Sequence, residues 1–200
     1  MTDPTYKSYI VYTANTELAV TLERARMQLR NEDLAFDDEH LRGIIRAASD
    51  YVERTYGLAL LTQTIKQYHS DFPCDTGTPL LLRITPLSGT PNVVVQYVDS
   101  AGATQTWTSS EYTTGQYNGR PFIIPKTGYS WPSDVDTDLP NAVTVTYSAG
   151  YGAKPSTVPP VITQALLLKI TDLYENRTDP PRDRQTASDV LLQPFYQFSC

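Results

Sequence analysis

The chain has 200 residues, of which 40% are hydrophobic and 19% charged, and its formal net charge at pH 7 is −6. This net negative charge argues against a protein whose main function is to bind nucleic acid, because contacts with phosphates need clustered Lys and Arg. No apolar run approaches the roughly 18 residues that span a bilayer, so no membrane contact is predicted, and the N-terminus lacks the pattern of a secretory signal. The two cysteines, Cys74 and Cys200, are too few for a disulfide framework, which fits assembly in a reducing cytoplasm.

Two helices are predicted close to the N-terminus. The first spans residues 22–30 with Thr21 as its N-cap, and a short link separates it from the second. Asp37 is the predicted N-cap of the second helix, and Gly57 ends it. Apolar residues at helical spacing predict the buried face of this helix: Leu41, Ile44, Ile45, Ala48 and Val52.

Between residues 61 and 147 the hydrophobic pattern changes to period two, which predicts an antiparallel β-module. Asp99-Ser100-Ala101-Gly102 has the composition of a hairpin turn. Residues 125–140 are predicted to form a long polar loop that contains Trp131. The predicted strands start at 62–65 and continue with 80–84, 93–98, 103–107, 121–124 and 142–147.

Helical patterns return near the C-terminus. Pro159-Pro160 suit the first turn of a helix, and residues 161–174 then carry apolar side chains on more than one face. Such a helix is either central to the core or covered on its second side by another subunit. A Pro-rich break at 179–184 precedes a short predicted helix at 187–192.

These elements predict an α+β fold, in which a helical bundle from the N- and C-terminal segments holds an inserted antiparallel β-module. The predicted division is an N-terminal arm at 1–20, a helical bundle made of 21–60 and 158–200, and the inserted β-module at 61–157.

The chain offers no recognisable catalytic constellation. His40 and His69 are its two histidines, and neither has a partner at metal-ligand spacing. No segment matches a nucleophile elbow or a dinucleotide-binding loop. Residues 134–138 resemble the start of a calcium loop, but Leu139 stands where Gly is needed and Val145 where a bidentate Glu is needed. We therefore predict no catalytic residue, no cofactor and no metal, and expect that the chain is not an enzyme.

Tyrosine is unusually frequent, with 14 residues. Tyrosine is enriched in strands and also in half-buried interfaces, so the composition leaves two explanations open, a β-rich domain and an interface. The C-terminal tail is also rich in aromatic residues: Phe195, Tyr196 and Phe198 either dock onto a partner or pack against their own subunit. Nearby Arg182 and Arg184 belong either to a solvated loop or to a docking site for an acidic protein surface.

Short segments spread over roughly residues 20 to 178 share their order and spacing with a known family. They are Thr21-Leu22-Glu23, Asp37-Asp38-Glu39, Tyr51-Val52-Glu53, Leu61-Thr62-Gln63-Thr64, Pro86-Leu87, Tyr112, Asn141-Ala142-Val143-Thr144-Val145 with Ala149-Gly150-Tyr151-Gly152, and Pro159 to Leu168 with Tyr174-Glu175-Asn176-Arg177. In these segments the chain resembles the head–tail connector (adaptor) proteins of tailed bacteriophages and related gene-transfer particles.

The resemblance implies a structural virion protein. Proteins of this family form a ring, commonly twelve-fold, beneath the portal at the capsid vertex, extend the DNA channel, and receive the stopper or tail. The implied partners are further copies of the chain, the portal protein and a stopper or tail protein, while DNA passes without sequence-specific binding. The implied location is the head–tail junction of the virion, after assembly in the host cytoplasm.

Two sets of residues are candidate contacts in such an assembly. The exposed face of the second helix is the candidate subunit contact, and the C-terminal tail is the candidate portal contact. The first set is Arg42, Arg46, Asp50 and Glu53, and the second is Arg182, Arg184, Phe195, Tyr196 and Phe198.

Two other functions remain open from the sequence. One is another virion joining component, a stopper or tail-completion protein. The other is a carbohydrate-binding β-module, which Trp107, Trp131 and the many tyrosines on a β-scaffold suggest. Helices at both ends of the chain argue against the second.

Overall fold

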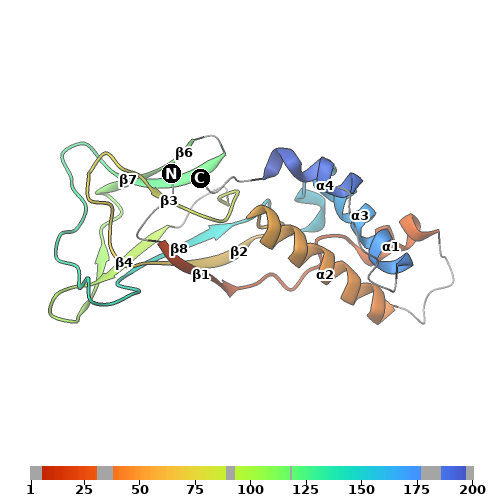
Figure 1. Cartoon of the computed structure of the whole chain (residues 1–200), viewed down its shortest axis with the longest axis horizontal. Helices are drawn as coiled ribbons and strands as arrows, with labels where there is room; N and C mark the ends of the chain where they lie inside the picture. The colour runs from red at the N-terminus through yellow and green to blue at the C-terminus, as the bar shows by residue number, and fades with distance from the viewer. Residues whose placement is uncertain (1–5, 31–37, 89–92, 118, 177–185, 197–200) are drawn as a thin grey trace. The chain divides into compact units, whose positions relative to one another are not determined.

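The computed structural model describes residues 6–30, 38–88, 93–117, 119–176 and 186–196 (Figure 1). The chain forms two compact units, a β-rich unit built from residues 6–14 and 62–150 and a helical unit built from 15–61 and 151–196. In these residues the fold is mixed α and β, with four α-helices and antiparallel sheets. None of the helices described is both long enough and apolar enough to cross a membrane.

The helical unit begins with two capped helices, α1 (Leu22–Leu29) and α2 (Asp38–Tyr56). The Thr21 hydroxyl accepts the N–H of Arg24 at 3.3 Å, which confirms the predicted N-cap of α1. Gly57 has a φ of 66°, and the N–H of Leu58 donates to the carbonyl of Glu53, so α2 ends where its glycine predicts. All five residues predicted for the buried face of α2 are buried, and the predicted N-cap Asp37 lies outside the described residues.

Helix α3 (Pro160–Glu175) lies at the centre of this unit, where it contacts α1, α2 and α4 (Ala187–Leu192). Pro160 occupies its first turn, where the missing N–H of proline costs no hydrogen bond. Burial on several sides explains why α3 is apolar on more than one face: its position in the core decides between the two explanations that the sequence left open. Its buried apolar residues are Ile162, Ala165, Leu166, Leu167 and Ile170.

The β-rich unit contains two antiparallel sheets. The five-stranded sheet has the order β1-β2-β8-β4-β5, and the three-stranded sheet has the order β3-β7-β6. Alternate residues of β8 are fully buried, as period-two strands with one covered face require. The strands are β1 (Tyr6–Thr13), β2 (Gln63–His69), β3 (Leu80–Leu81), β4 (Val94–Val98), β5 (Thr104–Trp107), β6 (Tyr112–Tyr117), β7 (Arg120–Pro125) and β8 (Val143–Ala149).

The predicted hairpin between β4 and β5 is confirmed. The two strands pair antiparallel from Val95↔Trp107 to Val98↔Thr104. Asp99 organises the turn, because its Oδ1 accepts the backbone N–H groups of Ala101 and Ala103 at 3.0 and 2.8 Å. The hydrogen bond that Gln105 donates to the Asp99 carboxylate has the largest effect on the pKa of Asp99. It lowers this pKa together with the two backbone bonds. Gly102 supplies the positive φ of 80° that the turn needs.

Three departures from the predicted strands have identifiable causes. The sequence analysis predicts no strand at Tyr6–Thr13 or Tyr112–Tyr117, yet both form strands through long-range pairing, β1 with β2 and β6 with β7. The strand predicted at 80–84 is reduced to the two residues of β3. Beyond it, side chains of the neighbouring sheet bind the backbone: Gln67 Oε1 accepts the N–H of Arg83, and the Tyr147 hydroxyl accepts the N–H of Ile84.

Candidate interaction surfaces

The outward face of α2 presents the first set of predicted contact residues. Arg42 and Arg46 lie one turn apart and are exposed, on the side of the helix away from its buried stripe. Within the described residues neither arginine takes part in an ion pair, whereas Asp50 accepts a hydrogen bond from Arg54 at 2.8 Å. The structure therefore leaves two positive charges on this face available to a partner.

Glu53 differs from the other three members of this set. Its side chain is half-buried, and its carboxylate accepts the N–H of Leu60 at 2.8 Å. This bond anchors the segment that follows α2 to the end of the helix. The geometry gives Glu53 a role inside its own unit, which an exposed helical position in the sequence did not indicate.

A carboxylate, Asp189, organises the C-terminal part of the helical unit. Thr186 and Asp189 form a capping box at the start of α4, with the Thr186 N–H donating to Asp189 Oδ2 at 3.1 Å. The hydroxyls of Tyr51 and Tyr56, both on α2, donate to Asp189 Oδ1 at 3.4 and 3.3 Å. One carboxylate therefore caps α4 and also connects it to α2.

The electrostatics of this cluster follow from its burial. Burial opposes ionisation of Asp189, but the hydrogen bonds from Thr186 and the positive charge of Lys169 outweigh it and lower its pKa. The same cluster raises the pKa of Tyr56 to about 12, first through burial and then through the negative charge of Asp189. Lys169 also lies over the Tyr51 ring, 4.1 Å from its centroid.

The aromatic tail lies partly on its own unit. Phe195, in the short 3-10 helix Gln193–Phe195, packs against the helical core. The ring of Tyr196 meets that of Tyr56 edge-on at 5.9 Å, yet Tyr196 is 43% exposed. Tyr196 is therefore held on its own unit and is also partly exposed to solvent. The other predicted portal-contact residues, Arg182, Arg184 and Phe198, lie outside the described residues.

An aromatic cluster fills the end of the β-rich unit. Phe72 stacks on Trp131 with ring centroids 5.3 Å apart, and Trp107 lies 5.2 Å from Trp131 and 4.8 Å from Tyr112. Trp107 and Trp131 are only 6% and 7% exposed. Sugar-binding platforms present a free ring face, so the burial of both tryptophans argues against a carbohydrate-binding module.

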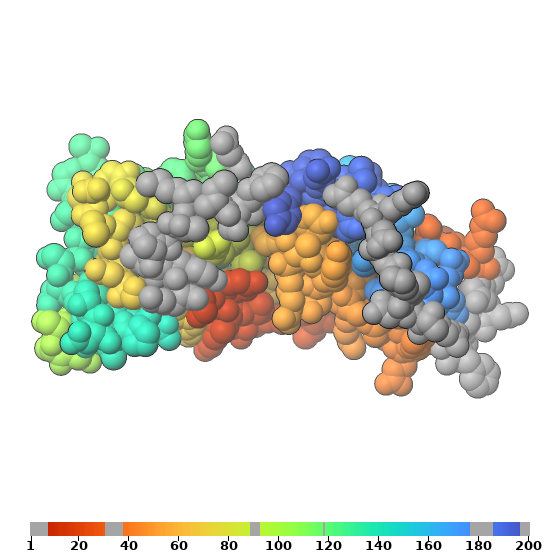
Figure 2. All heavy atoms as spheres, viewed as in Figure 1, coloured from red at the N-terminus to blue at the C-terminus, as the bar shows by residue number. Residues whose placement is uncertain are grey.

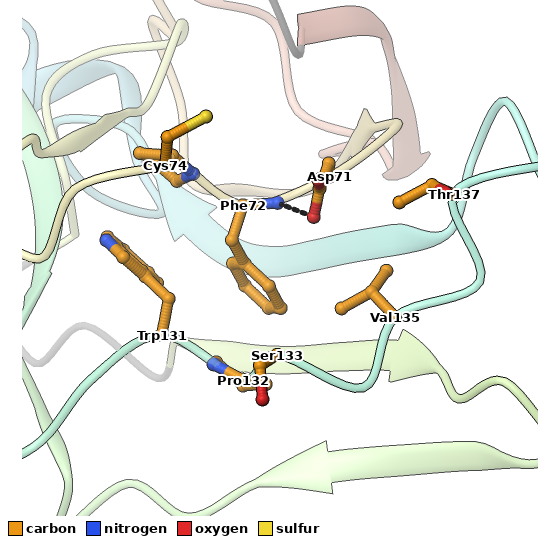
Figure 3. A pocket seen from close by; sticks show the side chains of 9 residues that line it. Asp71, Phe72, Cys74, Trp131, Pro132, Ser133, Val135 and Thr137 are labelled. Atoms are coloured by element: carbon orange, nitrogen blue, oxygen red, sulfur yellow. Dashed lines mark hydrogen bonds between the residues drawn. The ribbon is translucent and has the colours of Figure 1, made fainter.

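An open hollow of about 210 Å³ borders this cluster (Figure 3). Phe72 and Trp131 form its apolar wall, while Asp71 and Thr137 lie at its polar edge. The Asp71 carboxylate accepts the N–H of Phe72 at 2.7 Å, which holds the turn that carries the ring. Among the residues that line the hollow, no nucleophile and base are joined by a hydrogen bond.

The two histidines have structural surroundings. His69 is fully buried on β2, and its Nε2 accepts a hydrogen bond from Gln67 Nε2 at 2.8 Å. His40 is exposed on α2, with its ring centroid 6.4 Å from that of Tyr174. Across the part of the chain that the structure describes, no three His, Cys, Asp or Glu side chains gather as metal ligands.

The calcium-like segment serves as loop structure. Asp134 Oδ1 accepts the N–H of Ser100 at 3.3 Å, and Asp136 Oδ1 accepts the N–H of Asp138 at 3.2 Å. Short Asp side chains that accept nearby backbone N–H groups are a common means of ordering a loop. These two carboxylates are used in this way.

Sequence reasoning missed the Asp189 cluster and strand β1. The first has a local signal, since Thr186-x-x-Asp189 is a capping-box spacing immediately before a short apolar run. The second also has one, because residues 9–13 are all aromatic or β-branched, the types that favour strands. The contacts of Asp189 with Tyr51 and Tyr56, which are more than 130 positions away, have no sequence signal.

Comparison with known proteins gives similarity in structure only. No family model and no curated protein matches the chain. A chain in the virion of the native gene transfer agent (GTA) particle and one in the neck of the empty GTA particle, computed with C6 symmetry, each match at 23% identity and a TM-score of 0.79. A chain in the neck of the native GTA particle, computed with C12 symmetry, matches at 21% identity and a TM-score of 0.74. Each match covers 96% of both chains.

These values define the class of fold. Chains that align over 96% of both lengths at such TM-scores share the order and pairing of their elements, even at 21–23% identity. The chain therefore has the fold of a chain present in structures of the GTA virion and its neck.

Proposed function

We propose that this chain is a structural virion protein of the neck, specifically a head–tail connector (adaptor) that joins the capsid to the tail. The observation that carries the proposal is the fold shared with GTA neck chains over 96% of both chains. The connector-like segments of the sequence support the same assignment independently. In this function the chain is not an enzyme, and it needs no cofactor or metal.

The proposed assembly is a ring of identical copies beneath the portal, with the twelve-fold symmetry in which one matching neck was computed. A closed ring needs heterologous contacts, in which one face of each subunit meets a different face of its neighbour. The exposed face of α2 is a proposed contribution, through Arg42, Arg46 and Asp50. Glu53 contributes indirectly, by anchoring the segment that follows α2.

The proposed portal contact is the C-terminal tail. Tyr196 supports this, because it is held on its own unit through Tyr56 and still exposes much of its ring. Large amphipathic rings of this kind dominate many protein interfaces. Phe195 positions the tail by packing on the helical core. Arg182, Arg184 and Phe198 complete the proposed contact.

The proposed architecture assigns a task to each part of the chain. The helices of the two terminal segments form one bundle, and residues 62–150, the larger part of the β-rich unit, are inserted between these segments in the sequence. The ring extends the DNA channel and receives the stopper or tail protein. A net charge of −6 favours passage of DNA without binding to the channel, because the negative protein repels the negative phosphates. The ring occupies the head–tail junction of the virion after assembly in the host cytoplasm.

Electron microscopy of the chain alone and mixed with its portal protein tests the proposal. We expect rings that attach to the portal. A ring that binds the tail tube but not the portal would instead indicate a stopper or tail-completion protein, the second candidate, which the shared neck fold equally supports. A chain that attaches to neither would overturn the proposed function.

A further inference from the structure

Strand β1 is an edge strand of the five-stranded sheet. It lies at one end of the five-stranded sheet, and among the described residues no strand pairs with its outer side. Natural edge strands are usually shortened or interrupted by charges or proline, because unpaired backbone groups invite another strand. β1 is eight residues long, and Lys7 is its one charged residue. Its pairing with β2 is irregular between Tyr6 and Ser8 and between Val11 and Thr13, but residues 8–13 contain neither a charge nor a proline.

The side chains of β1 are apolar and exposed on both faces of the strand. Ile10 and Tyr12 point to one face and Val11 to the other, and they are 47%, 61% and 44% exposed. Val11 pairs with Ile65, which is completely buried, so the covered face of the sheet continues into β1 and is left open there. Figure 2 shows the red atoms of this segment at the molecular surface.

At the opposite end of the same sheet, no strand among the described residues pairs with the outer side of β5. β5 is the last strand, and its residues Thr104, Gln105 and Thr106 are exposed. All four pairings in the sheet are antiparallel, so β1 and β5, as first and fifth strands, run in the same direction. A second copy turned about a ring axis would therefore place its β1 parallel to β5 of the first.

We propose that β1 of each subunit docks against β5 of the next copy of this chain and continues the sheet from subunit to subunit. The contact joins two different edges, which is the heterologous arrangement that closes a ring. It supplies partners for the unpaired edge of β1 and covers Val11. The inference deepens the proposed connector function and rests on it for closure of the ring.

Paired cysteines test the contact directly. In a chain with Cys74→Ser and Cys200→Ser, Val11→Cys is combined with Gln105→Cys, because the registers place both side chains on the covered face of the sheet. Neighbouring strands lie about 4.8 Å apart, within reach of a disulfide, so oxidation should yield a ladder of covalent oligomers. Val11→Cys combined with Tyr117→Cys, an exposed position outside the contact, should yield none. Dimers from Val11→Cys alone would show β1–β1 pairing and overturn the arrangement.

A charge at the edge tests its role in the ring. Val11→Lys should abolish rings in electron micrographs, because a charged edge strand resists pairing. Val11→Thr, which stays β-branched and uncharged, and Tyr117→Lys, which places the same charge elsewhere, should both form rings. Thermal unfolding of each variant checks that the monomer is intact.

The outcomes separate this inference from the proposed function. Rings from wild type and Val11→Lys alike would overturn the edge contact and leave the connector function standing. Cross-linking of the chain with cysteines at 11 and 105, together with a wild type that never forms a ring, would overturn the connector function and leave the contact. If Val11→Lys loses portal binding, the wild type stays monomeric and the paired-cysteine chain does not cross-link, then β1 binds the portal and the proposed occupant is wrong.

Discussion

Gln67 connects the two sheets through hydrogen bonds to backbone. It is completely buried, its Nε2 donates to the carbonyl of Leu81 at 2.7 Å, and its Oε1 accepts the N–H of Arg83 at 2.9 Å. We expect Gln67→Leu to lower the free energy of unfolding by about 3 kcal/mol, because buried backbone groups left without partners cost about 1–3 kcal/mol each.

Urea denaturation followed by tryptophan fluorescence measures this effect. Both tryptophans of the chain, Trp107 and Trp131, lie in the β-rich unit, so the signal reports that unit alone. The matched control is Gln96→Leu on β4, whose exposed bond to Thr106 spans 3.4 Å and should change stability by less than about 0.5 kcal/mol. Equal effects of the two variants would contradict the role of Gln67.

Tyr56 gives the helical unit a stability that depends on alkaline pH. Its pKa is raised from 10.0 to about 12, so the folded state holds the phenolic proton more tightly than the unfolded chain does. The resulting stabilisation is complete below pH 10 and is lost as the pH rises toward about 12.

Thermal unfolding followed by far-UV circular dichroism, for wild type and Tyr56→Phe, measures this dependence. We expect a constant difference between the two below pH 10 that shrinks above it, because the variant has no proton to lose. The difference isolates Tyr56 from the other tyrosines. A difference that stays constant across the whole range would show that Tyr56 does not titrate as its surroundings indicate.

At the scale of elements, the β6–β7 hairpin depends on a glycine. Gly115 pairs with Phe122, and a Cβ at Gly115 would lie 2.4 Å from Cζ of that ring. We expect Gly115→Ala to turn the ring aside and cost about 1 kcal/mol, read by tryptophan fluorescence in urea. Gly77→Ala, where a Cβ meets no atom within 4 Å, should be neutral or slightly stabilising. Equal changes in the free energy of unfolding for the two variants would mean that the Phe122 ring can move aside without destabilising the hairpin.

Deletion of the C-terminal tail should abolish portal binding and leave the fold intact. Deletion of residues 194–200 leaves α4, its capping box and the bonds of Asp189 in place. We expect portal binding to be abolished, with a loss of only about 1 kcal/mol in stability from the partly buried Phe195. Pull-down with the portal and thermal unfolding measure the two effects. Tyr117→Ala is the control, and unchanged portal binding by the deletion variant would exclude the tail as the contact.

At the scale of the whole molecule, the α2 face should contribute charge to subunit association. We expect Arg42→Glu with Arg46→Glu to weaken ring formation roughly tenfold or more, because reversed charges replace attraction with repulsion across the contact. Sedimentation at low and high salt measures this, and salt should reduce the effect. Lys154→Glu, an exposed charge reversal in a loop, should leave association unchanged. If it weakens rings equally, net charge alone is responsible.

Much of the element order could be predicted because its signals are local. The cap at Thr21, the glycine at 57, the proline pair at 159–160 and the hairpin turn at 99–102 each act within a few residues. The strands β1 and β6 escaped prediction because pairing with distant segments decides them. The same holds for the shortened strand at β3, where Gln67 binds the backbone from another sheet.

The candidate contact residues also divide into those that local spacing predicts and those that only the tertiary fold reveals. Helical spacing alone places Arg42 and Arg46 opposite the buried stripe of α2, and the structure confirms their exposure. The spacing could not show that Glu53 binds the N–H of Leu60, or that Tyr196 lies against Tyr56, since both contacts depend on where the chain folds back.

The sequence by itself determined the mixed α and β class, the capped helices and the connector-like order of segments, because periodicity and capping are properties of neighbouring residues. Only the tertiary structure decided that α3 is a core helix, that Trp107 and Trp131 are buried, and that β1 forms an open sheet edge. Burial and edge exposure depend on which distant segments meet, and that is settled only when the whole chain packs.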